Sequence, residues 1–189
     1  MRYFISMRGF SLLELLIVLS IFSILTTIAF ANLTPSIAEH QTERKTRDLL
    51  KLFNLAKTTA ISDSILTTIC PIDDGGQCSK NWNLYPIALF LDPNNDRELK
   101  NTGALIQILP QTPNVRLDVA PNWKSYFQYD RLGTSHGSMG NVSICNTGST
   151  LYSSRQLVIS LSGRARLSVD RNYDGIAERS DGTTVQCSD

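Results

Sequence analysis

The sequence lacks the residue patterns on which most known enzyme mechanisms depend. It contains no glycine-rich loop of the kind that binds phosphates and no cysteine–histidine pattern of a thiol nucleophile. It has only two histidines, His40 and His136. Ser135 is adjacent to His136, but adjacent residues rarely form a catalytic pair, and no carboxylate is placed to complete a triad. We therefore expect no enzymatic activity and no cofactor.

The sequence also lacks a strong net charge, internal repeats and low-complexity stretches. Its 18 basic and 17 acidic residues give a formal charge of +1 over 189 residues. A hydrophobic content of 42% with 19% charged residues fits a folded domain rather than a disordered tail. Because the total charge favours no particular partner, any nucleic-acid binding has to come from a local cluster of basic residues.

One hydrophobic run dominates the N-terminal part of the chain. Residues 10–31 contain a single charged residue, Glu14, and are long enough to cross the ~30 Å hydrocarbon core of a bilayer as a helix. Arg2 and Arg8 precede the run, and basic residues favour the cytoplasmic side. We expect a single membrane-spanning helix, with the remaining chain on the opposite side of the membrane.

The carboxylate of Glu14 is unusual inside a membrane segment. Placing a carboxylate near the bilayer centre costs roughly 2.5–3.5 kcal/mol, so this one is either tolerated close to the interface or functional. Cleavage between Gly9 and Phe10 would leave a free amine at the tip of the hydrophobic helix. In an assembly of such helices, Glu14 of one subunit could pair with that amine of its neighbour.

The run MRGFSLLELLIVLSI resembles the type III leader of type IV pilins and pseudopilins. An ordinary secretory signal loses its apolar region on cleavage, whereas this type of leader is cut before an apolar helix that is kept. The resemblance implies a leader peptide over residues 1–9, cleavage after Gly9 by a prepilin peptidase, and N-methylation of Phe10. It also implies that Glu14 guides assembly with other pilins into a helical fibre. The protein is then expected first in the inner membrane, with its C-terminal domain in the periplasm, and later in a pilus at the cell surface.

Four cysteines, all after the hydrophobic run, indicate disulfide bonds. An even number in an oxidising compartment favours two bridges, and four cysteines allow three connectivities. We expect Cys70–Cys78, which closes a small loop, and Cys145–Cys187, which fixes the C-terminal tail. A zinc site is the weaker alternative, because the C-x₇-C spacing and the lack of a nearby histidine do not suit it.

Periodicity predicts one long helix followed by short strands. An amphipathic helical half is expected over residues 32–62, with an apolar stripe that includes Leu49 and Phe53. Pro35 is expected to kink the helix or to mark where it leaves the membrane. Short apolar or alternating runs predict strands at 65–70, 84–91, 104–109, 115–119, 125–129, 142–146, 156–160 and 165–169. The sequence therefore predicts an α+β fold, with a globular antiparallel β domain over residues 63–189.

Several segments of this domain resemble the GspH/FimT group of minor pilins. They are LAKTTAISDSILTTICP, the cysteine-closed loop before Trp82, ALFLDPNNDREL, and SLSGRARLS near the C-terminus. The resemblance implies a long N-terminal helix packed against two small antiparallel sheets. The group includes pseudopilins of type II secretion systems and minor pilins of type IV pili, some of which are needed for DNA uptake.

A short arginine motif near the C-terminus is the candidate binding element. In an extended strand, residues two apart point the same way, so Arg164 and Arg166 would present two guanidinium groups on one face. Each planar group can bind two phosphate oxygens at once, and Gly163 permits a turn or a close backbone approach to a ligand. The further candidates that flank the pair are Arg155, Arg171 and Arg179.

Arginines on an edge strand also have a simple structural explanation, because their charge discourages edge-to-edge pairing. In the DNA-uptake branch of the GspH/FimT group, however, a C-terminal Gly-Arg-x-Arg motif is the DNA-binding element, and Gly163, Arg164 and Arg166 match it. The resemblance thus implies non-specific, salt-dependent binding of extracellular double-stranded DNA for natural transformation. The alternative is a structural pseudopilin of a type II secretion system without DNA binding. Lys124 and Arg131 are candidates for extending the patch.

Two acidic stretches have the spacing of weak calcium sites. Oxygen ligands recur as in an EF-hand loop at Asp170, Asn172, Asp174 and Asp181, but no flanking helices are expected. The simpler explanation is an Asn/Asp/Gly turn, which needs no metal. The segment Asp92–Asp96 lacks the glycine that such a loop requires. We therefore expect no bound metal.

Overall fold

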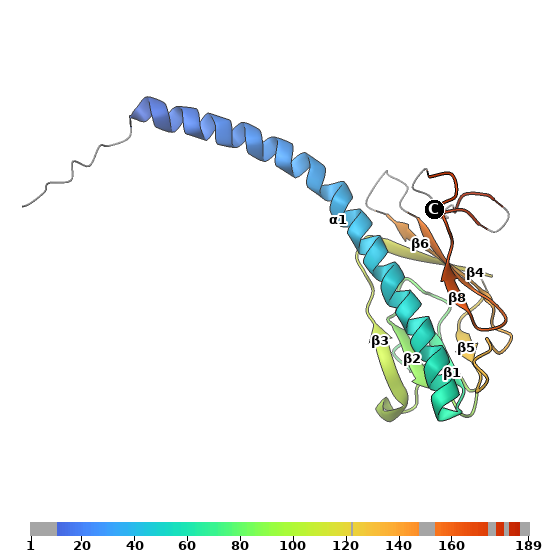
Figure 1. Ribbon diagram of the computed structural model, residues 1–189. Coiled ribbons are helices and arrows are strands. Elements are labelled where there is room, and N and C mark those ends of the chain that lie inside the picture. The colour runs from blue at the N-terminus through green and yellow to red at the C-terminus, as the bar shows by residue number, and fades with distance from the viewer. Residues whose placement is uncertain (1–10, 122, 148–153, 174–176, 180–181, 186–189) are drawn as a thin grey trace, which may run out of the picture. The chain divides into compact units, whose positions relative to one another are not determined.

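The computed structural model describes residues 11–121, 123–147, 154–173, 177–179 and 182–185, without the side chains of residues 27–38 (Figure 1). The chain forms two compact units, Met1–Ile37 and Ala38–Asp189. One helix, α1 (Leu12–Asp63), begins in the first unit and ends in the second. Short strands make up most of the regular structure in the rest of the described chain.

In the first unit, Ser11 lies directly before the start of α1. Its carbonyl accepts the first intrahelical bond, from the N–H of Leu15 at 3.1 Å, and its hydroxyl accepts the N–H of Glu14 at 3.3 Å, so one of the free donors at the helix start has a side-chain partner. Every large apolar side chain from Leu12 to Leu25 is at least 50% exposed. The helix continues through Pro35 and does not end there.

Among the described residues, no helix is long and apolar enough to cross a membrane. The membrane segment expected at residues 10–31 extends over side chains outside that description, so it stays a prediction. The leader at residues 1–9 and the roles of Gly9 and Phe10 also fall outside the described residues and stay predictions.

In the second unit, α1 turns one apolar face towards the sheets. Leu49, Leu52, Phe53, Ala56 and Ala60 are fully buried, and except for the adjacent pair they recur at steps of three or four residues. The predicted apolar stripe is therefore confirmed, with Leu52 as an additional member.

The strands form two four-stranded antiparallel sheets, as the resemblance implied. The first has the order β3-β2-β1-β5 and consists of β1 (Thr67–Pro71), β2 (Ile87–Leu91), β3 (Leu105–Leu109) and β5 (Phe127–Tyr129). The second has the order β4-β6-β7-β8 and consists of β4 (Val115–Ala120), β6 (Gly140–Asn146), β7 (Arg155–Ile159) and β8 (Ala165–Leu167). A 3₁₀ turn, η1 (Thr102–Ala104), precedes β3. The α+β fold and all the predicted strands are confirmed, with strand ends shifted by three residues or fewer.

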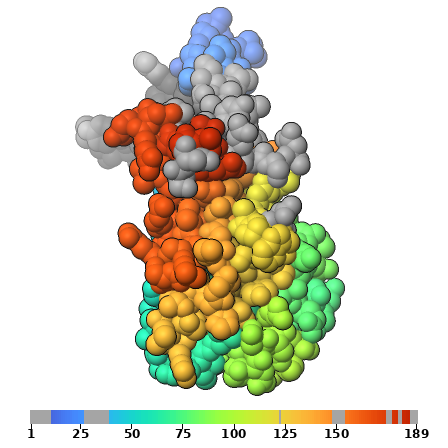
Figure 2. Space-filling view, turned by 90° about the vertical axis from the view of Figure 1, so that its right-hand side faces the viewer, coloured from blue at the N-terminus to red at the C-terminus, as the bar shows by residue number. Residues whose placement is uncertain are grey.

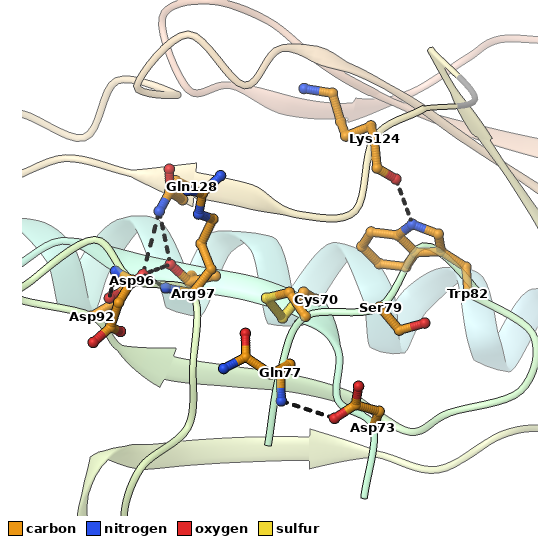
Figure 3. Close-up of a disulfide and its surroundings, with 12 residues drawn as sticks. Cys70, Asp73, Gln77, Ser79, Trp82, Asp92, Asp96, Arg97, Lys124 and Gln128 are labelled. Carbon is orange, nitrogen blue, oxygen red and sulfur yellow. Dashed lines mark hydrogen bonds between the residues drawn. A yellow bond between two sulfur atoms is a disulfide. The ribbon is translucent and has the colours of Figure 1, made fainter. Parts of the chain in front are cut away.

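The main apolar core joins α1 to both sheets (Figure 1). Phe53 of α1 meets the rings of Phe127 and Tyr129 on β5 edge-on, with centroid distances of 5.1 and 6.5 Å. Trp82 lies against Phe127 at 5.7 Å, and its indole N–H donates to the carbonyl of Lys124 at 3.0 Å (Figure 3). The second sheet contributes Leu117, Val142, Ile144, Leu157 and Ile159. This core fixes the β7–β8 hairpin relative to the second half of α1.

The connection between β1 and β2 is closed by the disulfide Cys70–Cys78, as predicted (Figure 3). Cys70 is fully buried, and an antiparallel bridge joins Ile72 to Cys78 within the loop. Cys145 on β6 is also disulfide-bonded. Its expected partner, Cys187, lies outside the described residues, so that pairing stays a prediction.

Candidate nucleic-acid interface

The arginine motif occupies the hairpin that joins β7 to β8, at one edge of the second sheet. Ala165 and Leu167 pack against the core, whereas Arg164 and Arg166 are exposed. Arg166 pairs with Val158 on the neighbouring strand. This alternation places both guanidinium groups on the outward side of the hairpin, as the two-residue spacing predicted.

Gly163 shapes the tip of this hairpin. Its φ of +72° lies in the left-handed region that glycine adopts without strain, and its N–H donates to the carbonyl of Ser160 at 2.9 Å. A Cβ at this position would lie 2.0 Å from the carbonyl oxygen of Gly133. The turn expected of this glycine is therefore present, and the close backbone approach seen here is to Gly133 of the chain itself.

The turn at residues 130–134 supports the hairpin tip and is held by Asp130. The carboxylate of Asp130 accepts the N–H groups of Leu132 and Thr134, each at 2.9 Å, and the hydroxyl of Thr134 at 2.6 Å. Partial burial acts to raise the pKa of Asp130. These hydrogen bonds and the nearby His136 act to lower it, and their effect is the larger. The pKa of Asp130 therefore lies below its ordinary value, and the carboxylate is ionised in the folded domain at neutral pH.

Contacts with the hairpin bring two further cations to its tip. The N–H of Ser135 donates to the carbonyl of Leu161 at 3.1 Å, which joins the turn carrying the exposed Arg131 to the hairpin. Lys57 of α1 donates from Nζ to the carbonyl of Ser162 at 3.2 Å. The sequence singled out Arg131 but missed Lys57, because this contact spans 105 positions and leaves no trace in the helical periodicity.

A second group of arginines lies along β8 and the segment after it. Arg166, Arg171 and Arg179 line a small hollow of about 50 Å³ together with Glu178. Glu178 is only 8% exposed, and its carboxylate accepts the N–H of Arg171 at 2.7 Å. Figure 2 shows the orange-red segment after β8 next to the red segment at 177–179 and 182–185 on one face. Three of the predicted arginines are thus brought together.

Two predicted candidates lie elsewhere. Arg155 on β7 pairs with Ile144, whose side chain is in the core, so Arg155 is on the opposite side of the sheet from Arg166. Lys124 is 5% exposed, with its Nζ 5.1 Å from the ring centroid of Phe127, and burial lowers its pKa. We therefore exclude Arg155 and Lys124 from the candidate interface.

The described residues contain no cluster of three or more His, Cys, Asp or Glu side chains that could hold a metal ion. Asp170 accepts the N–H of Tyr173 at 2.7 Å through Oδ1, which is the hydrogen bond of an Asx-type turn. Asn172 is described as well, whereas Asp174 and Asp181 lie outside the description.

In the other acidic stretch, residues 92–96, the carboxylate of Asp92 is used for hydrogen bonds within the fold. Its buried carboxylate accepts the hydroxyl of Thr68 at 2.7 Å and the N–H groups of Asp96 and Arg97 at 3.0 and 3.2 Å. The side-chain amide of Gln128 approaches it at 3.4 Å (Figure 3). Both carboxylate oxygens of Asp92 therefore accept hydrogen bonds, which connect β1, β5 and the loop after β2.

Comparisons with known proteins identify two matching regions. Residues 45–163 match the family described as type II transport protein GspH, and residues 6–30 match the prokaryotic N-terminal methylation motif. No curated protein matches the chain.

Two solved structures are similar in fold, both of the type IV minor pilin FimU of Pseudomonas aeruginosa strain PAO1 in different crystal forms. The first is 17% identical and covers 67% of this chain and 92% of that chain, with a TM-score of 0.50. The second is 18% identical and covers 75% and 92%, with a TM-score of 0.45. At this identity the first supports the pilin-like fold alone.

Proposed function

Because the chain belongs to the family of the type II transport protein GspH and carries the N-terminal methylation motif, we propose that it is a minor type IV pilin that binds extracellular double-stranded DNA for natural transformation. The family match ends at residue 163, so the binding role is argued from the arginines themselves. The observation that carries it is the outward-facing pair Arg164 and Arg166 on an exposed hairpin. DNA held there would be drawn in when the fibre retracts, with energy supplied by a motor elsewhere.

The surroundings of the hairpin support phosphate binding. Lys57 and Arg131 accompany Arg164 near the tip, while Arg171 and Arg179 accompany Arg166 along the edge. Guanidinium groups bind phosphate oxygens in pairs, and such backbone contacts carry no sequence information. We therefore expect binding that is independent of DNA sequence and falls steeply with salt.

The N-terminal segment belongs to the same proposal. A prepilin peptidase would cleave after Gly9, Phe10 would be N-methylated, and Glu14 would pair with the new amine of a neighbouring pilin. Residues 10–31 would hold the subunit in the inner membrane, with its domain in the periplasm, before it enters the fibre. The exposed apolar side chains from Leu12 to Leu25 support burial in lipid or among other pilin helices.

The second candidate is a structural pseudopilin of a type II secretion system, which the description of the matched family favours. In that case Arg164 and Arg166 would face solvent or contact another subunit, and the domain would have no affinity for DNA.

The two candidates are separated by titrating the second compact unit, residues 38–189, with random-sequence duplex DNA at low and physiological salt. The test variant is Arg164→Gln/Arg166→Gln. The matched control is Arg44→Gln/Arg47→Gln, which removes the same charge from exposed positions on α1. We expect salt-sensitive binding that is lost in the test variant and retained in the control.

Equal losses in the two variants would indicate a general charge effect and contradict the assigned site. If the folded, oxidised unit fails to bind DNA at low salt, the DNA-binding function is wrong and the pseudopilin function remains.

A further inference from the structure

The segment after β8 is held to the second sheet at its beginning. The N–H and the hydroxyl of Ser168 both donate to the carbonyl of Gln156 on β7, at 2.8 and 3.2 Å. The N–H of Glu178 donates to the carbonyl of Val169 at 3.3 Å, so the chain at residue 178 returns to the end of β8. The stretch between Val169 and Glu178 carries Arg171.

A hydrogen bond from Arg171 to Glu178 ties this stretch down. One carboxylate oxygen of Glu178 accepts the backbone N–H of Arg171 at 2.7 Å. Within the part of the chain that the structure describes, it is the one hydrogen bond that Arg171 forms. The side chain of Arg171 is exposed. The place of its guanidinium group therefore depends on the backbone position that Glu178 fixes.

The charges around Glu178 indicate more than a structural turn. Glu178 is only 8% exposed, and a buried carboxylate needs positive charge close by. The hollow that it lines is also lined by Arg166, Arg171 and Arg179 (Figure 2 shows the two segments after β8 that contribute to it). Three guanidinium groups thus surround one carboxylate. The excess positive charge is available to an external anion such as a phosphate group.

We propose that Glu178 is a positioning residue of the candidate nucleic-acid interface, which holds Arg171 beside Arg166 so that both can bind the DNA backbone. The inference rests on the proposed DNA binding. Glu178 acts through two opposite effects. Its hydrogen bond favours binding, because an ordered Arg171 loses less conformational freedom when it meets a phosphate. Its negative charge disfavours binding, because it repels the same phosphate.

Two substitutions separate these effects, since Glu178→Gln and Glu178→Met remove the same charge and fill a similar volume. Glutamine keeps a side-chain oxygen that can accept the N–H of Arg171, whereas methionine has none. The measurement is the affinity of the full chain, purified in a non-ionic detergent, for random-sequence duplex DNA. We expect Glu178→Gln to bind at least as tightly as the parent protein and Glu178→Met to bind severalfold more weakly than Glu178→Gln.

The same pair of substitutions in an Arg171→Gln background tests whether Glu178 acts through Arg171. The difference between glutamine and methionine at position 178 should then disappear, because the positioned guanidinium group is gone. Amide exchange reports the tether without DNA: the N–H of Arg171 should stay protected in Glu178→Gln and exchange faster in Glu178→Met. A thermal melt verifies folding, and Glu178→Ala replaces Glu178→Met if the latter does not fold.

Asp73 offers the matched control. Its carboxylate accepts the N–H groups of Gly75 and Gln77 at 3.0 and 2.9 Å, in the connection between β1 and β2 of the other sheet. Asp73→Asn and Asp73→Leu also remove one negative charge each and differ in the same hydrogen bonding. These two variants should bind DNA equally.

The outcomes distinguish this inference from the proposed function. If the parent protein binds DNA and the two Glu178 variants bind it equally, the role of Glu178 is wrong and DNA binding stands. A difference that persists in the Arg171→Gln background would also overturn the role, because Glu178 would then act on another part of the surface. If the parent protein does not bind DNA, the proposed function is wrong, and the role of Glu178 in it is wrong as well.

Discussion

At the scale of single residues, Gly163 and Asp130 set the position of the hairpin tip. The backbone of Gly163 rests on Gly133, and Gly133 lies in the turn that the carboxylate of Asp130 holds. Neither residue carries a positive charge, yet both fix the backbone from which Arg164 and Arg131 project. Their effects can therefore be measured as stability, without DNA.

Replacing Gly163 by alanine should lower the free energy of unfolding by about 2–4 kcal/mol. The new Cβ would adopt an unfavourable φ and would also meet the carbonyl of Gly133 at 2.0 Å. Gly137→Ala is the matched control, because Gly137 has a similar φ of +71° but no atom lies within 4 Å of the place its Cβ would take. Urea unfolding should show a loss of only about 1 kcal/mol for the control. Equal losses would contradict the close contact at the tip.

Asp130→Asn should destabilise the domain at neutral pH by about 1–3 kcal/mol, because the turn loses charge-assisted hydrogen bonds. The pKa of Asp130 is lowered in the folded state. Its contribution to stability is therefore present above the ordinary carboxyl pKa and is lost as the pH falls through the lowered value. Unfolding curves of the two proteins should converge below about pH 4, the region of ordinary carboxyl titration. A difference that stays constant with pH would contradict this role.

At the scale of elements, the connection between β1 and β2 depends on its disulfide. The bond Cys70–Cys78 spans eight positions and closes a short loop beside the buried end of β1. In the loop-entropy description, a loop of this length stabilises the folded state by about 2.5 kcal/mol.

Cys70→Ala/Cys78→Ala should accordingly unfold at lower denaturant concentration, with a loss of about 2–3 kcal/mol. Alanine suits both positions because Cys70 is fully buried and a polar replacement would lack partners. A variant as stable as the parent protein would show that the loop is ordered without the covalent bond.

The elements also show what the sequence could and could not predict. Short apolar or alternating runs located the strands, and the alternation arises where one face of a sheet lies on the core. The same alternation predicted the outward pair Arg164 and Arg166. Alternation would also have placed Arg155 correctly, because it lies two residues before the buried Leu157 and therefore on the core side of the sheet. Arg155 was nevertheless chosen as a binding candidate for its charge alone. The order of the strands and the contact of Lys57 with Ser162 depend on tertiary packing, which periodicity does not encode.

At the scale of the whole molecule, the net charge is close to zero, and positive charge is concentrated only in local clusters. Losing Arg2 and Arg8 with the leader would leave 16 of the 18 basic residues against 17 acidic ones. A nearly neutral subunit gains little from long-range attraction to DNA, so binding has to come from the few cations around the hairpin. The core begins on α1 within the unit Ala38–Asp189, so this unit is suited to measuring that binding.

The most direct test of DNA binding at Arg164 and Arg166 is the salt dependence of the binding constant for duplex DNA, measured by fluorescence anisotropy. Each phosphate contact contributes about 0.9 to the slope of log K against log salt concentration. We predict that Arg164→Gln/Arg166→Gln reduces this slope by roughly two, while Arg44→Gln/Arg47→Gln leaves it unchanged. An unchanged slope in the hairpin variant, or no binding by the parent protein, would contradict the assignment.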